Sequence, residues 1–228
     1  MRMQNPLSGW PKTKPLRNKT GYRVNARYLT PERARLVDAG TKLLVFSGFA
    51  YIGWLYLEKE FTTGNDVLVA LGLWGAASAF VWFTRYSWGR SNFGKTTTVQ
   101  FQPDAIRIKN GMGYKNYDRG LPHEFDYSIH DKAQREEEQD IEAKQKAAME
   151  GKKEPPKKGK YYRNAFHIVL RYAGQRVDVA SVFGKKDAEA LLVRLQLLDQ
   201  MMDAARGDAA VPAWSEPATQ YGQRPEAG

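Results

Sequence analysis

Two long apolar segments without charged side chains constrain the fold of this chain most. Residues 43–57 read LLVFSGFAYIGWLYL, and residues 67–83 read VLVALGLWGAASAFVWF. A bilayer-spanning helix needs about 20 apolar residues, and both segments reach that length with their neighbours. Two buried helices of a soluble core are the alternative, but both segments are apolar on every face, with little amphipathic chain nearby to enclose them. The pattern predicts a transmembrane helical hairpin over residues 37–88.

Aromatic and small residues support this hairpin. Aromatic side chains near the ends of the segments are predicted to anchor it at the membrane interface: Trp54, Trp82, Tyr86 and Trp88. Small residues four positions apart are predicted to let the two helices pack closely: Gly72, Gly75, Ala76 and Ala79.

The distribution of charge predicts the orientation of the hairpin. The chain has 35 Lys and Arg against 25 Asp and Glu, and its formal net charge is +10. The segment EKEFTTGND between the apolar runs is acidic, whereas both outer flanks are basic. Since cytoplasmic flanks are enriched in Lys and Arg, we expect a multi-pass protein of the bacterial inner membrane with both termini in the cytoplasm.

Residues 1–36 are predicted to form a basic N-terminal arm. Its first part contains several prolines and no hydrophobic periodicity, so we expect it to be extended or disordered. A helix is predicted to begin at Pro31, because proline suits the first helical position and Thr30 can cap it.

Residues 96–206 predict a small cytoplasmic α+β domain. TTTVQFQPDAIRIKNG alternates apolar and polar residues around a Pro-Asp turn, which is typical of two strands, and NYDRGLPHEFDYSIH allows one or two more. Residues 161–184 predict a hairpin that turns at Ala173-Gly174-Gln175. KKDAEALLVRLQLLDQMMDAAR then predicts an amphipathic C-terminal helix.

A charged insertion, residues 131–160, interrupts this domain. It is rich in helix formers but has almost no apolar stripe, so it is either a solvated helix or a docking element for a partner protein. The tail, residues 207–228, is predicted to be disordered.

Several short strands closed by one C-terminal helix, entered through FGKKDAEALLVRLQLL, resemble the pleckstrin-homology-like (PH-like) fold. Together with the hairpin, the chain is similar to bacterial membrane-anchored PH-like-domain proteins and to a photosystem assembly factor of that architecture. The resemblance implies an antiparallel sheet or barrel closed by the helix; a small α+β domain of another topology stays open. In eukaryotic members the first hairpin loop binds phosphoinositides, and the corresponding segment here is NGMGYKNYDRG.

Residues 89–96, GRSNFGKT, match the G-x-x-x-x-G-K-T pattern of nucleotide phosphate-binding loops. That loop requires a preceding strand and a following helix. Here an apolar helix precedes the motif and a strand is predicted to follow it. We therefore interpret the segment as a juxtamembrane linker.

The sequence contains no arrangement typical of catalysis. Cysteine is absent, and the three histidines, His123, His130 and His167, show no recognisable metal-ligand spacing. We expect a protein that is not an enzyme, without a metal, cofactor or small-molecule substrate.

Basic residues in and before the sheet are predicted to contact lipid headgroups: Lys95, Arg107, Lys109, Lys115 and Arg119. The favoured function is a scaffold, assembly factor or accessory subunit of a membrane complex, with membrane lipids and other subunits as partners. An anionic-lipid-binding module is one alternative. Another is a subunit of a secretion or DNA-transfer machine, although nucleic acid is not an expected partner, because the N-terminal segment lacks interleaved aromatics.

Overall fold

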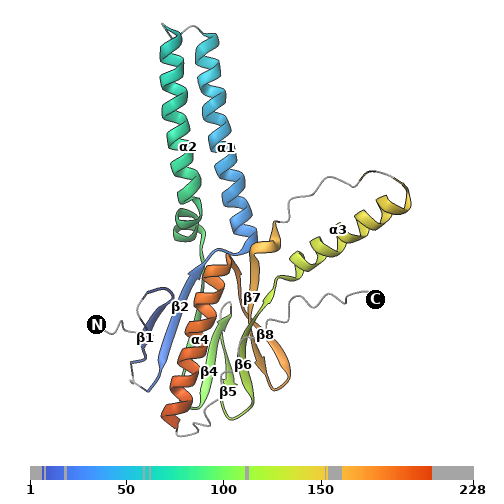
Figure 1. Ribbon diagram of the computed structural model, residues 1–228. Coiled ribbons are helices and arrows are strands. Elements are labelled where there is room, and N and C mark those ends of the chain that lie inside the picture. Colours follow the sequence, from blue (N-terminus) through green and yellow to red (C-terminus); the bar gives the residue numbers. More distant parts are fainter. Residues whose placement is uncertain are drawn as a thin grey trace, which may run out of the picture.

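The computed structural model describes residues 7, 9–17, 20–58, 60–61, 63–110, 113–151, 153 and 161–206. Two sheets and a C-terminal helix form a domain from which two long helices rise side by side (Figure 1). The elements in chain order are β1 (Lys12–Pro15), β2 (Tyr22–Tyr28), α1 (Pro31–Leu57), α2 (Gly64–Phe93), β3 (Lys95–Phe101), β4 (Ala105–Asn110), β5 (Gly113–Asp118), β6 (His123–Ile129), α3 (Asp131–Met149), the 3-10 helix η1 (Tyr162–Asn164), β7 (Ala165–Tyr172), β8 (Gln175–Phe183) and α4 (Lys185–Arg206).

Both sheets are antiparallel. One has the strand order β1-β2-β3-β4-β5, and the other has the order β6-β7-β8. The expected α+β class with two long apolar helices and a C-terminal helix is confirmed. A closed barrel is not, because no ladder joins the two sheets within the described residues.

The predicted basic arm, residues 1–36, was expected to be extended or disordered in its first part, and it contains two extended strands that belong to the larger sheet. β2 pairs with β3 along its whole length, with Tyr28 opposite Lys95. Val24 and Tyr28 are buried in the core, and the exposed Arg23 and Arg27 on the other face of the strand hide this alternation in the sequence. The hairpin is therefore inserted between two neighbouring strands, whereas the sequence predicted that it precedes the domain.

The core lies between the sheets and under α4. The apolar pairs expected on one face of the first strands are all buried, as are the leucines of the predicted helical stripe. The core side chains from these elements are Val99, Phe101, Ile106, Ile108, Leu191, Leu195 and Leu198. The turn of the predicted hairpin is confirmed, although Gln175 already belongs to β8; Ala173 and Gly174 both have positive φ, as a type I′ turn requires.

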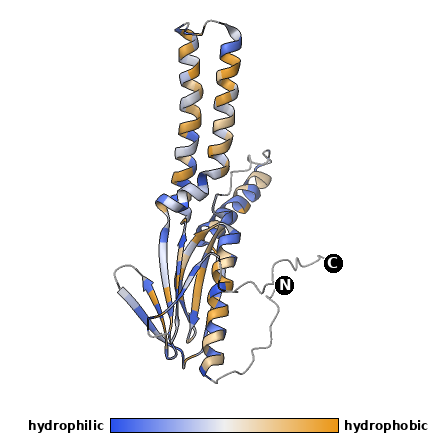
Figure 2. Ribbon diagram, turned by 90° about the vertical axis from the view of Figure 1, so that its left-hand side faces the viewer, coloured by the Kyte–Doolittle hydropathy of each residue, from blue (hydrophilic) through white to orange (hydrophobic). Residues whose placement is uncertain are grey.

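Both long helices begin at side-chain caps. The Thr30 hydroxyl accepts a hydrogen bond from the Arg33 amide, with Pro31 in the first turn as predicted. Thr63 and Asp66 form a reciprocal capping box at the start of α2. α1 and α2 are each long and apolar enough to cross a bilayer, and Figure 2 shows hydrophobic residues along both.

The two helices approach each other at Gly48 of α1. The Trp74 ring packs against this glycine, and the Trp74 indole donates a hydrogen bond to the Val45 carbonyl (3.1 Å). A bulky ring in the interface needs a gap on the facing helix, which glycine provides. The structure does not place the predicted small-residue stripe in this interface: a Cβ at Gly72 or Gly75 would meet no atom within 4 Å, and Ala76 and Ala79 are exposed.

Candidate functional site

The hairpin and the domain meet at a closely packed junction. A Cβ at Gly89 of α2 would lie 2.8 Å from a Val37 methyl carbon of α1, so only glycine fits there without a shift. Leu29, between β2 and α1, packs in the same cluster as Val37. The Leu29 carbonyl accepts a hydrogen bond from the Phe183 amide at the end of β8 (2.8 Å). Both helices are therefore in direct contact with the domain.

A polar cluster joins α1 to α2 just above this packing. Arg85 Nε donates to Asp38 Oδ1 (2.8 Å), and the Tyr86 hydroxyl donates to Asp38 Oδ2 (2.9 Å). The Arg85 guanidinium also lies over the rings of Trp82 and Tyr86. Tyr86, predicted as an interface anchor, is thus half-buried in this cluster. Among the other predicted anchors, Trp54, Trp82 and Trp88 are exposed.

Two further contacts fix the base of the hairpin, one to the domain and one between its own two helices. Arg90, in the last turn of α2, forms a salt bridge with Asp187 in the first turn of α4 (3.0 Å). Arg33 in the first turn of α1 donates to the Phe93 carbonyl (2.6 Å), so the beginning of one helix is bonded to the end of the other. The Arg90–Asp187 salt bridge restrains the domain relative to the helices.

The segment GRSNFGKT forms the end of a helix and the start of a strand. Gly89–Phe93 complete α2, Gly94 caps it, and Lys95 opens β3, so no linker separates them. The Gly94 amide donates to the Arg90 carbonyl (3.1 Å). A helix C-terminus carries partial negative charge and repels phosphate, whereas the nucleotide-binding loop uses a helix N-terminus.

Of the predicted lipid contacts, only Lys95 lies at the junction. Lys109 pairs with Thr98, which is about 10 Å further along β3 from the helices. Arg107 on β4 and Lys115 on β5 are at a similar or greater distance from the helices. Arg107 also donates a hydrogen bond to the Asn116 side chain.

Exposed basic residues surround the junction, and we call four of them the basic collar: Arg27, Arg35, Lys95 and Lys186. Arg27 lies opposite Thr96 in the β2–β3 ladder, and Lys186 is next to Asp187, which bonds to α2. In the described part of the chain, none of these four has a carboxylate at salt-bridge distance. Of these four, the sequence predicted Lys95 alone as a lipid contact; Arg27, Arg35 and Lys186 were missed, because tertiary folding brings β2, α1 and α4 together at this level.

Arg119 is not a lipid contact, and that prediction is wrong. Its side chain is 0% exposed and pairs with both Asp199 and Asp203 of α4. From the turn between β5 and β6 it reaches α4, where two carboxylates favour its charged form.

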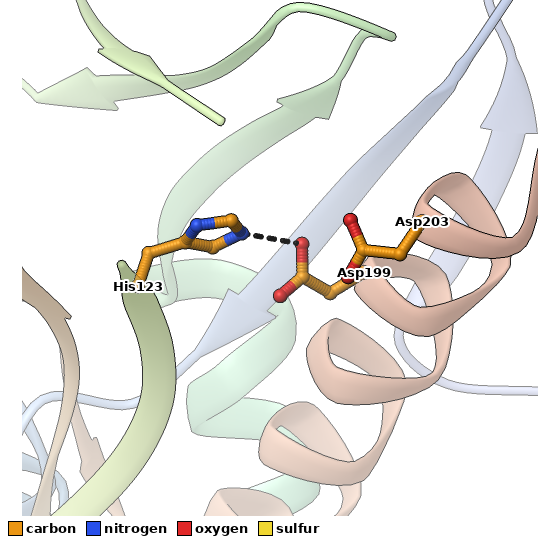
Figure 3. Close-up of side chains that lie close together, drawn as sticks. All are labelled: His123, Asp199 and Asp203. Atoms are coloured by element: carbon orange, nitrogen blue, oxygen red, sulfur yellow. Dashed lines mark hydrogen bonds and ion pairs between the residues drawn. The ribbon is translucent and has the colours of Figure 1, made fainter. Parts of the chain in front are cut away.

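His123 belongs to the same cluster (Figure 3). Its Nε2 lies 3.2 Å from Asp199 Oδ1, and its Nδ1 lies 2.8 Å from the Leu121 carbonyl oxygen. Both partners accept hydrogen bonds, so both ring nitrogens donate only when the ring is protonated. The hydrogen bond to Asp199 accordingly raises the pKa of His123.

The ligand atoms of His123, Asp199 and Asp203 lie within 4.8 Å of one another, a spacing that could hold a metal ion. Metal binding requires a neutral histidine and free carboxylates. Here the hydrogen bond to Asp199 raises the pKa of His123, which opposes the neutral ring that a metal needs, and the Arg119 guanidinium already pairs with both carboxylates. The cluster is therefore an ion-pair network that connects the β5–β6 turn to α4.

The other two histidines stack on each other where α3 begins. The rings of His130 and His167 are 4.3 Å apart, and His130 Nδ1 accepts a hydrogen bond from the Lys132 amide (3.1 Å) as the N-cap of α3. Burial and the neighbouring His167 lower the pKa of His130. Lys132 also pairs with Glu32 of α1 (3.0 Å). The N-terminal end of α3 is thus bonded to the junction, and the rest of the helix projects away from the sheets (Figure 1).

No family model, no curated protein and no solved structure matches this chain. Its function has to be inferred from its own geometry. The features available for that inference are the inserted hairpin, the packed junction, the basic collar and the surfaces of the domain.

Proposed function

We propose that this protein is a membrane-anchored scaffold, assembly factor or accessory subunit of a bacterial inner-membrane complex, acting through protein contacts of a cytoplasmic domain. One observation carries the proposal: the hairpin is inserted between β2 and β3, and both helices pack directly on the domain. A domain attached in this way presents its surfaces at a fixed height and orientation above the bilayer. Fixed presentation suits a scaffold better than a freely moving binding module.

The charge at the two ends of the hairpin supports a cytoplasmic domain. Glu58, Glu60 and Asp66 lie at the end away from the domain, and the basic collar lies at the domain end. Basic residues are favoured on the cytoplasmic side. The domain and both chain termini are therefore assigned to the cytoplasm.

The strand order supports the PH-like resemblance. β2 to β5 correspond to a four-stranded sheet, β6 to β8 correspond to a three-stranded sheet, and α4 follows as the closing helix. The chain departs from that pattern in three elements: the added strand β1, the projecting helix α3, and the α1–α2 hairpin inserted between β2 and β3. Protein-binding surfaces are common on such appended elements.

The test is isolation of the full chain from its native membrane under gentle detergent extraction with an affinity tag. We expect other membrane subunits to co-purify in fixed stoichiometry. A parallel preparation of an unrelated tagged hairpin protein identifies proteins that bind non-specifically. Recovery of the chain alone, at several detergent concentrations, would contradict the proposal.

The basic collar favours a second function, binding of anionic lipid. Each basic residue near an anionic surface contributes about 1 kcal/mol, so four together are enough to retain headgroups. Native mass spectrometry of the purified chain should show bound phosphatidylglycerol that is lost when the four collar residues are changed to alanine. The matched control changes Arg107, Lys109 and Lys115 to alanine and should keep the lipid. Equal loss in both variants would contradict a site at the collar.

A further inference from the structure

A cleft of about 650 Å³ opens between β5 and β8. β5 is an edge of the five-stranded sheet, and β8 is an edge of the three-stranded sheet. The cleft is bordered by three consecutive residues of β5, Lys115–Tyr117, and by four consecutive residues of β8, Gln175–Asp178. No ladder joins these two edges within the described residues, so the sheets stay open here.

The run of consecutive residues shows how the cleft is oriented. Successive side chains of a strand point to opposite faces, so a cavity over one face meets only every second residue. This cleft meets every residue of both segments, and therefore it is open to the strand edges themselves. Among the described residues, β5 pairs only with β4 and β8 pairs only with β7. Both edges carry backbone groups that are available to a further strand.

The side chains of the cleft combine an apolar floor with charged walls. Ile108 is buried, and Tyr117 and Val177 are half-buried, so the floor is apolar. Such a floor suits the inward-facing apolar side chains of an added strand.

Two basic residues, Lys115 and Arg176, and one acidic residue, Asp178, line the cleft and give its lining a formal charge of +1. Arg176 is already paired with Asp178 (3.1 Å) and with Asp131 outside the lining (3.7 Å). Lys115 lies opposite Ile108 in the β4–β5 ladder and shares its inward face. It has no carboxylate partner in the part of the chain that the structure describes. A charge at an open edge discourages indiscriminate pairing, and this one favours a strand that carries an acidic side chain.

We infer that the cleft between β5 and β8 binds an extended acidic segment of a partner protein, which adds as a strand to these edges. The apolar floor receives alternate side chains of that segment, and Lys115 pairs with a carboxylate on the same face. This inference rests on the proposed function, since it specifies how the domain would bind another subunit.

The probe is a fluorescein-labelled seven-residue peptide, Thr-Val-Thr-Glu-Thr-Val-Thr, added to the full chain in detergent micelles. Its valines and glutamate occupy alternate positions and so share one face. We expect saturable binding by fluorescence anisotropy. A peptide N-methylated at alternate residues, which cannot form one row of backbone hydrogen bonds, should bind at least tenfold more weakly. This comparison leaves the protein unchanged.

Charge reversal tests the role of Lys115. Lys115→Glu should weaken binding of the glutamate peptide at least tenfold. The same variant should bind a peptide with lysine in place of glutamate more tightly than it binds the glutamate peptide. Lys109→Glu makes the same change on the outward face of β4 and should alter affinity less than twofold. Far-UV circular dichroism verifies that both variants are folded.

Four results would each overturn the inference. The first two are absence of saturable peptide binding and equal affinity for the N-methylated peptide. The third is an equal loss of affinity in Lys115→Glu and Lys109→Glu. The fourth is displacement of the peptide by short-chain phosphatidylglycerol, which would identify a lipid site. Failure of peptide binding together with stoichiometric co-purification of partners would leave the proposed function standing. Peptide binding by a chain that is always isolated alone would support the cleft and contradict the scaffold.

Discussion

Arg119 has a fully buried side chain that carries a permanent charge. Burial of an arginine is tolerated only where carboxylates and hydrogen bonds replace water, and Asp199 and Asp203 of α4 provide them. His123, when protonated, adds a second cation on Asp199. These residues connect the β5–β6 turn to the C-terminal helix, so their role is structural.

Removal of Arg119 should destabilise the domain strongly. Arg119→Met leaves Asp199, which is only 13% exposed, without its main partner, and the free energy of unfolding should fall by about 3 kcal/mol. Urea unfolding of the full chain in detergent micelles measures this. Arg107→Met, on the outward face of β4, should change it by less than about 0.5 kcal/mol. Similar values for both variants would contradict the assigned network.

The pKa of His123 is raised above its ordinary value of 6.5, mainly by the hydrogen bond to Asp199. The protonated ring therefore stabilises the folded chain, fully below pH 6.5, and this contribution is lost as pH rises through the folded-state pKa. The difference in unfolding free energy between the natural chain and His123→Gln should be larger at about pH 5.5 than at about pH 8.5. A difference that is constant or grows with pH would oppose this assignment.

The two long helices approach each other closely at Gly48, as they do at Gly89. Gly48 leaves room for the Trp74 ring, whereas a Cβ at Gly53 of the same helix would meet no atom within 4 Å. Gly53→Ala should be neutral or stabilise α1 by up to about 1 kcal/mol through helix propensity. Gly48→Ala should instead lower the thermal midpoint and shift the NMR signal of the Trp74 indole N–H. Equal midpoints for the two variants would contradict the packing described.

Helix α3 should lose its N-terminal cap in acid. Burial and His167 lower the pKa of His130 below 6.5, so its contribution to stability is complete above pH 6.5 and is lost as pH falls through the folded-state pKa. Glu32 and Asp131 oppose this shift, and Lys132 adds to it. Hydrogen exchange in the first turn of α3, corrected for intrinsic rates, should accelerate about fivefold in acid. His130→Asn keeps a cap acceptor that does not titrate and should remove the pH dependence.

The elements with uninterrupted periodicity could be predicted from sequence. β3, β4, β7, β8 and α4 carry regular apolar patterns, and Thr30-Pro31 marks the start of α1. β2 was hidden because arginines occupy its outward positions. The contact of Arg119 with Asp199 joins residues far apart in the chain, and no local pattern indicates it. The β5–β8 cleft depends on the divergence of two sheets, which local sequence does not determine. The tail, residues 207–228, and most of residues 151–160 lie outside the described residues.

At the scale of the whole molecule, the domain is built from both sides of the hairpin. Residues 96–206 alone lack β1 and β2, and with them the core side chains Val24 and Tyr28. We expect that fragment to be insoluble or to give a poorly dispersed NMR spectrum. Replacement of residues 30–93 by Asn-Gly, between Leu29 and Gly94, should instead give a soluble folded domain, because this turn suits a two-residue hairpin. Equal folding of both would contradict the role of β2.

The same insertion has a consequence for biosynthesis. β2 leaves the ribosome before the two long helices, and its partner β3 leaves after them. During synthesis the larger sheet stays incomplete until the second helix has been made. If the helices span a bilayer and only one of them inserted, β2 and β3 would lie on opposite sides of the membrane and could not pair. A folded domain would then form only on chains whose two crossings were both completed, so folding itself would report correct membrane insertion.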